Sequence, residues 1–288
     1  MNQDLESLLN RTKEVISEVR SFSLECLGLP IKKGFNDFKE DGQNYFWVYV
    51  SEKRSLNSVV NKELQNRPCF FDDREKAEDF SRQYQSKGYD TYVYEGSAHS
   101  GEPQITLSFI NSSIYRKASV LIHESVHNFL EDCSRDKDFS KIPYDLNEAL
   151  ATYIGERGAL NFCKIHYPSQ VIIGLKNITF FEEFSKRINV YHSLLQVNYA
   201  NGLGEEKIIL DSFKKELKSM GIPCKREDDF NNAYLAMFIN YTRLYPIISN
   251  YFSDGRRTIK GLFGCSRKKK ITKFERLLKL REEFTLVL

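Results

Sequence analysis

Several features that define special classes of protein are missing from this sequence. No apolar run approaches the roughly 18–20 residues of a membrane-spanning helix, so no span is expected. Glycine and proline together occupy only 22 of 288 positions, which excludes collagen-like and low-complexity chains. The first residues, MNQDLESLLNRTKEV, are polar and contain no apolar core of a signal peptide. The chain as given is therefore expected to be cytoplasmic, with a periplasmic or membrane-anchored location as the alternative if an N-terminal signal was removed.

The cysteines and the charge balance also exclude classes of site. The six cysteines are never closer than 30 residues, so a CxxC zinc site is excluded and free thiols are expected. A net charge of +3 is too small to indicate nucleic acid, and no nucleic-acid partner is expected. Residues 253–288 carry eleven basic and four acidic side chains. This pattern predicts a solvated basic helix face, with a weak contact between residues 256–281 and an anionic membrane surface as the alternative.

Hydrophobic periodicity predicts a mostly helical α+β protein. Strands are expected at 44–50, 91–96 and 104–109. Helices are expected at 3–27, 74–87, 114–133, 146–165, 179–200, 204–220, 229–253 and 271–284. Asp73 is the expected N-cap of the second helix, and Gly88 its expected end.

One segment of the expected helix 114–133 carries a metal-binding pattern. Residues 120–129, VLIHESVHNF, contain HExxH. Residues four apart share a helix face, so His123 and His127 can both point at one metal ion. Glu124 lies beside His123 and can reach a water on such an ion without being a ligand itself. The alternative is a pair of histidines that only pack or cap.

A zinc site of this type needs a third protein ligand. The extended motif HExxHxxGxxH is excluded, because Leu130 and Cys133 occupy its glycine and histidine positions. Glu148 follows His127 by 21 positions, which allows the first helix to end and a second to return beside it. Small residues next to Glu148 permit close approach of the two helices. Glu148 is therefore the expected third ligand, and a first-turn glutamate favoured by the helix dipole is the alternative.

These motifs resemble a known class of enzyme. HESVH followed by LNEALATY is similar to the gluzincin metallopeptidases, in which an Asn-Glu pair at nearly this distance supplies a zinc ligand. The wider chain resembles a bacterial family of predicted zinc aminopeptidases. The matching stretches are 20–30, 45–51, 70–96, 120–130, 146–158, 199–207 and 231–246.

The resemblance implies a zinc-dependent metallopeptidase that hydrolyses peptide bonds, with an aminopeptidase-like preference. Zn²⁺ would be the cofactor, held by His123, His127 and Glu148, and a peptide would be the substrate. Glu124 would take a proton from a zinc-bound water and pass it to the leaving amine. The aminopeptidase label comes from the family, since the GAMEN motif of the large zinc aminopeptidases does not occur.

Other residues are candidates for supporting roles. Tyr241, Arg243 and Tyr153 could stabilise a developing oxyanion, although a packed tyrosine or a paired arginine is the favoured explanation of each. Thr152 lies one turn after Glu148 and could orient an imidazole.

The expected fold is zincin-like, with a small sheet beside a helical subdomain. Residues 1–288 are expected to form a single catalytic unit, divided into an N-terminal helix with the sheet (1–110) and a helical part carrying the zinc site (111–288). Two other functions stay open. One is a catalytically silent peptidase-fold binding protein with a basic C-terminal surface, and the other is a zinc hydrolase of non-peptide amides.

Overall fold

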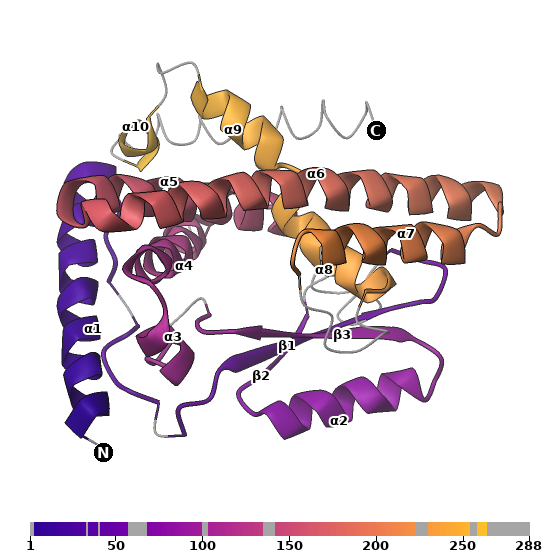
Figure 1. Cartoon of the computed structure of the whole chain (residues 1–288), viewed down its shortest axis with the longest axis horizontal. Helices are drawn as coiled ribbons and strands as arrows, with labels where there is room; N and C mark the ends of the chain where they lie inside the picture. The colour runs from indigo at the N-terminus through magenta and orange to yellow at the C-terminus, as the bar shows by residue number, and fades with distance from the viewer. Residues whose placement is uncertain are drawn as a thin grey trace. The chain divides into compact units, whose positions relative to one another are not determined.

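The computed structural model describes residues 3–32, 34–39, 41–56, 68–99, 103–134, 142–222, 230–253 and 258–263. These residues form a mostly helical protein with one small antiparallel sheet, as the α+β expectation required (Figure 1). The chain divides into two compact units that are discontinuous in sequence. Unit 1 contains residues 1–44, 97–180 and 244–288, and unit 2 contains residues 45–96 and 181–243. These units do not follow the expected division at residue 110, because the helices of 181–243 cluster with the sheet.

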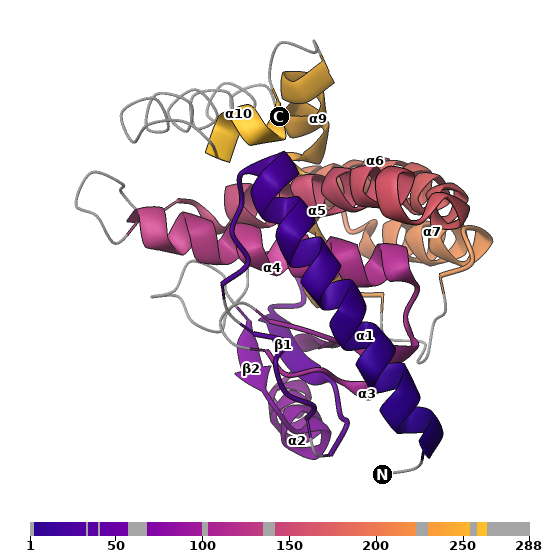
Figure 2. The ribbon, with the colours of Figure 1, turned by 90° about the vertical axis from the view of Figure 1, so that its left-hand side faces the viewer.

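Unit 1 is helical and is built around two long helices that pack side by side. Its elements are α1 (Gln3–Phe22), the π-helical turn η1 (Ser23–Leu27), α3 (Leu107–Asn111), α4 (Ile114–Ser134), α5 (Tyr144–His166), the 3₁₀ turn η3 (Pro168–Gln170), the start of α6 (Val171–Asn201), α9 (Tyr245–Ser253) and α10 (Ile259–Phe263). Helix α1 packs on α4, and α4 packs along α5 (Figure 2). Gly28 ends the first helical segment in the left-handed region (φ 68°), which glycine adopts without steric cost.

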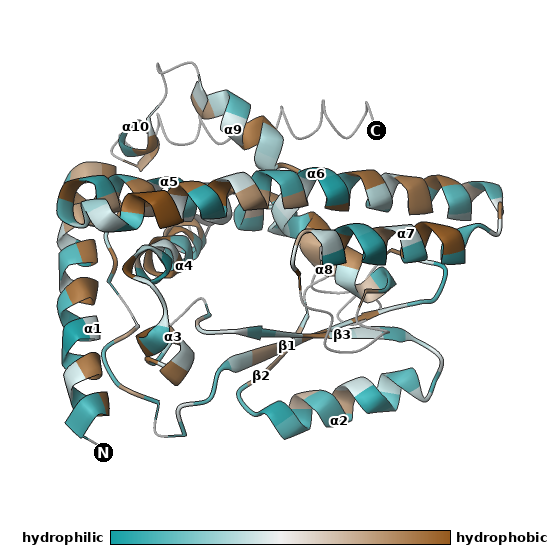
Figure 3. Cartoon of the chain, in the orientation of Figure 1, coloured by the Kyte–Doolittle hydropathy of each residue, from teal (hydrophilic) through white to brown (hydrophobic). Residues whose placement is uncertain are grey.

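Unit 2 is a sheet covered by helices on both faces. Its elements are β1 (Tyr45–Ser51), β2 (Cys69–Phe71), α2 (Arg74–Gln85), β3 (Asp90–Gly96), most of α6, α7 (Glu206–Ser219) and α8 (Asn232–Thr242). The strand order is β2-β1-β3, and both pairs are antiparallel. Alternate residues of β1 point to opposite faces, so Val48 packs against Ala77 of α2 and Tyr49 against Ala233 of α8. Helix α2 is largely hydrophilic in Figure 3, in keeping with its narrow buried face.

Most predicted helix boundaries are confirmed, and one capping prediction is confirmed in detail. The Asp73 side chain accepts a hydrogen bond from the Lys76 amide at 2.9 Å. Gly88 follows α2 with a φ of 87°. Among the described residues, no helix is both long and apolar enough to cross a membrane.

The expected strand at 104–109 is wrong. Ile105 makes only an isolated parallel bridge with Phe38, and Leu107–Asn111 forms α3. The Thr106 side chain accepts a hydrogen bond from the Phe109 amide at 3.3 Å, so a helix cap competes successfully with the alternating strand pattern. The short strand β2 was not expected, because three residues are too few to show a period.

Two further helix predictions need correction. The expected helix 229–253 is two helices, α8 and α9, which separate just before Pro246. Proline has no amide hydrogen and is tolerated only in the first turn of the second helix. Helix α6 begins at Val171 and not at 179, since Gly174 does not break it. The expected helix 271–284 lies outside the described residues, as does most of the basic segment 256–281.

A buried histidine in unit 2 makes its stability depend on pH. Burial and the nearby charge of Arg243 lower the pKa of His192 to about 4. Because this lies below the unfolded value of about 6.5, the folded protein binds the proton less tightly. Neutral His192 therefore contributes fully to the stability of the fold above pH 6.5, and this contribution is lost as the pH falls towards 4.

We therefore expect unit 2 to lose about 2 kcal/mol of stability between pH 7 and pH 5. A His192→Gln variant should lose less over the same interval, because it removes the titrating group. Urea unfolding followed by the fluorescence of Trp47, the single tryptophan, measures the difference in this unit. Equal pH dependence of stability in the wild type and the variant would contradict the assignment of this effect to His192.

Candidate metal centre

Helix α4 presents both histidines of the HExxH motif on one face. The Ser113 hydroxyl accepts a hydrogen bond from the Arg116 amide at 3.1 Å and caps the start of the helix. Leu121, Ile122 and Val126 are fully buried and fix the orientation of the helix in the core of unit 1. His123 and His127 are therefore held on the side that faces α5, as helix periodicity predicts.

Helix α5 supplies the acidic residue. It begins at Tyr144, and Glu148 follows within its second turn. The neighbouring residues Ala149 and Ala151 are completely buried, which is consistent with the expected close packing of small side chains. Glu148 itself is buried, with only 6% of its surface exposed. A buried carboxylate is unfavourable unless positive charge or hydrogen-bond donors face it.

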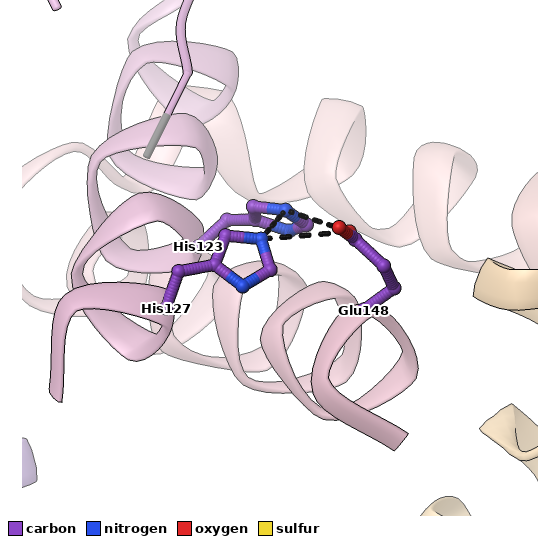
Figure 4. A group of neighbouring side chains, drawn as sticks. All are labelled: His123, His127 and Glu148. Atoms are coloured by element: carbon purple, nitrogen blue, oxygen red, sulfur yellow. Dashed lines mark hydrogen bonds and ion pairs between the residues drawn. The ribbon is translucent and has the colours of Figure 1, made fainter. Parts of the chain in front are cut away.

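The three side chains converge on one point (Figure 4). The Nε2 atoms of His123 and His127 lie 2.9 Å apart. Glu148 Oε2 lies 3.6 Å from the first nitrogen and 3.4 Å from the second. All three come from unit 1, so their arrangement is fixed by the packing of α4 on α5.

The donor set fits a small cation. Glu148 Oε2 is buried and has no hydrogen-bond partner, so this oxygen keeps a lone pair for a ligand. Ligand bonds of 2.0–2.1 Å in a tetrahedron place the ligand atoms about 3.3 Å apart. The three separations in the structure, 2.9, 3.4 and 3.6 Å, bracket that value. These three residues could therefore hold a metal ion.

Asn147 orients one of the imidazoles. Its Oδ1 lies 2.8 Å from His127 Nδ1, and because an amide oxygen only accepts, Nδ1 must donate. In the neutral ring this leaves the Nε2 lone pair directed at His123 and Glu148. A hydrogen bond of this kind fixes the tautomer that a metal ligand requires.

The electrostatics of the cluster favour positive charge. Burial alone lowers the pKa of His127, but the carboxylate of Glu148 outweighs it and raises this pKa to about 9. Burial raises the pKa of Glu148, yet the two imidazoles more than compensate and hold it well below its usual range. The buried carboxylate thus attracts a proton or another cation into the space between the three side chains.

Glu124 lies next to this cluster but outside it. The side chain is half-buried, and its negative charge contributes to the raised pKa of His127. It does not belong to the group of ligand atoms that lie within 4.8 Å of one another. A carboxylate near the three ligands and separate from them is the arrangement that a general base needs.

The candidate supporting residues have different outcomes. Tyr153 packs between Tyr245 and Phe252 at ring distances of 5.7 and 5.3 Å, which is a core position. The Thr152 hydroxyl is buried and has no hydrogen-bond partner, so it orients neither imidazole. Sequence reasoning missed Asn147 in this role, although its place directly before Glu148 was a visible signal. Tyr241 and Arg243 belong to unit 2, and their role as oxyanion donors stays a prediction.

Comparison with known protein families adds an independent observation. Residues 2–278 match the model of a family described as "Putative aminopeptidase". The chain belongs to this aminopeptidase family. The match covers almost the whole chain, and it supports a peptidase-like function. Searches of curated proteins and of solved structures found no match.

The Asn147 hydrogen bond gives a test of the centre in this aminopeptidase-family protein. We expect Asn147→Ala to weaken metal binding, measured with Zn²⁺ as the probe, about 10- to 100-fold, because the His127 ring loses the contact that fixes its tautomer. Competition with a chromophoric chelator measures the affinity. Thr152→Val is the matched control on the same helix and should bind zinc as the wild type does. Equal affinities in all three proteins would contradict the role of Asn147.

Proposed function

We propose that the protein is a zinc-dependent metallopeptidase of the zincin-like, gluzincin type, with aminopeptidase-like specificity. The observation that carries the proposal is the convergence of His123 Nε2, His127 Nε2 and Glu148 Oε2 in a member of an aminopeptidase family. Two adjacent helices of unit 1 hold these ligand atoms; His127 and Glu148 are buried, and His123 is partly exposed.

The chemistry of the donors favours zinc. Two imidazole nitrogens and one carboxylate oxygen form a set that catalytic zinc sites use, with the fourth position left open. Zinc held there would polarise a substrate carbonyl and lower the pKa of a water molecule to about 7. Asn147 supports this assignment, because it stabilises the His127 tautomer with a free Nε2.

Glu124 is the proposed general base and acid. It takes a proton from the water that attacks the scissile carbonyl, and it returns a proton to the nitrogen of the leaving amine. Its half-buried position leaves it accessible to solvent, and its charge reaches His127. A solvent-accessible carboxylate whose charge acts on a proposed ligand supports this role.

Glu124→Gln tests the mechanism directly. The variant should keep about one zinc per chain and lose peptide hydrolysis by about 10²- to 10⁴-fold, because glutamine cannot accept the proton. Metal analysis and peptide-cleavage assays measure the two properties separately. Glu148→Gln is the companion variant, and it should lose zinc along with activity.

The outcomes separate the alternatives. Hydrolysis by Glu124→Gln at the wild-type rate would refute the general-base role. A wild-type protein that binds zinc and leaves all peptides intact would favour a catalytically silent peptidase-fold binding protein. Cleavage of non-peptide amides alone would favour a zinc hydrolase of non-peptide amides. Failure of the wild type to bind zinc would refute the metal centre itself.

The aminopeptidase preference has its own test. An aminopeptidase recognises the α-ammonium group of its substrate, so blocking that group removes a required contact. We expect peptides with a free N-terminus to be cleaved at least tenfold faster than their N-acetylated counterparts, in keeping with the loss of one buried charged contact. Chromatography of the products measures both rates. Equal rates would refute the aminopeptidase preference.

A further inference from the structure

Two glycines lie in the interior of α5, at positions 155 and 158. Glycine destabilises a helix interior relative to alanine, so each position calls for a packing reason. Gly155 lies seven residues, or about two turns, after Glu148 and therefore shares its face of the helix. That face is turned towards α4 and the histidines.

The surroundings of Gly155 leave no room for a side chain. A Cβ atom there would lie 2.8 Å from the Ser119 carbonyl oxygen, 3.1 Å from His123 Cβ and 3.4 Å from His123 Cα. In an α-helix the carbonyl of residue 119 is the acceptor for the amide of residue 123. A side chain at position 155 would therefore contact the turn of α4 backbone that carries His123, the first histidine of the motif.

We propose that Gly155 is a positioning residue of the metal centre, which sets the separation between α5 and the His123 turn of α4. This inference rests on the proposed function, since it concerns the same three ligands. A methyl group at 155 would have to move from 2.8 Å to at least 3.0 Å from the carbonyl oxygen, and to 3.4 Å for an ordinary contact, and backbone atoms must supply that movement. Metal–ligand distances tolerate only about 0.2 Å. A shift of this size therefore displaces Glu148 relative to the imidazoles.

The same helix provides a control. A Cβ at Gly158 would lie 3.0 Å from Ile122 Cδ1 and 3.1 Å from Leu27 Cδ1. Both atoms are the ends of flexible side chains, which can rotate away without moving a helix. Gly158→Ala thus adds the same methyl group to the same helix without contact with a ligand.

A second control matches the severity of the clash. A Cβ at Gly174 would lie 2.8 Å from two ring atoms of Tyr115, in a part of unit 1 where it meets no metal ligand. Gly174→Ala should lose stability and keep its metal affinity. Comparison with this variant distinguishes displacement of the ligands from a general loss of packing.

The experiment measures metal affinity in the full-length chain, independently of catalysis. Zinc affinity of the wild type and the three alanine variants is determined by chelator competition, and the visible spectrum of the Co²⁺-loaded proteins reports the ligand geometry. Gly155→Ala should bind zinc about 10- to 100-fold more weakly and show an altered Co²⁺ spectrum. Gly158→Ala and Gly174→Ala should match the wild type in both properties.

Thermal unfolding at increasing zinc concentrations covers the case in which Gly155→Ala is unstable. The zinc concentration at which Tm begins to rise reports the affinity, whatever the starting Tm. A rise beginning at the wild-type concentration would overturn the proposal. So would a Gly155→Ala protein that stays unfolded at every zinc concentration while Gly174→Ala folds, because Gly155 would then be a general packing residue. Failure of the wild type to bind zinc would instead refute the proposed function.

Discussion

The centre depends on a carboxylate that is buried opposite two imidazoles. Burying a charge is costly, and an ion pair in the interior seldom repays the full desolvation cost. The Glu148 carboxylate therefore stays in place because the apolar packing of α4 on α5 holds it there. Fully buried residues on both helices, among them Leu121, Val126 and Ile154, supply that packing. The candidate metal centre and the core of unit 1 are parts of one helix–helix interface.

The positions of the three converging side chains could be predicted because helix periodicity is a local property. Residues 123 and 127 are one turn apart, and their neighbours from 114 to 134 favour an uninterrupted helix. Glu148 was predictable for a different reason, because no periodic pattern points to it. The HExxH motif needs a third protein ligand, and the loop after α4 is long enough for a second helix to return beside the first. The structure brings the three ligand atoms together, while their role as ligands stays a prediction.

Features that depend on contacts between distant segments could not be predicted. Asn147 and Thr152 are both small polar residues close to Glu148, yet only Asn147 reaches an imidazole. The difference depends on the packing of α5 against α4, which no sequence period encodes. The helix α3 was predicted as a strand for a related reason, since the Thr106 cap and an alternating pattern are equally compatible with that segment. The grouping of residues 181–243 with the sheet is likewise a tertiary property.

Several local rules of helix construction are broken at the same interface. A glycine occupies a helix interior at position 155, a carboxylate is buried at 148, and a threonine hydroxyl at 152 has no partner. Each feature lowers stability by itself, and elsewhere such features are usually compensated by nearby contacts. Their concentration within two turns of one helix is typical of a site where geometry is maintained at the expense of stability. A cation between the three side chains would compensate the buried charge, so the same ion would stabilise the fold and enable the proposed chemistry.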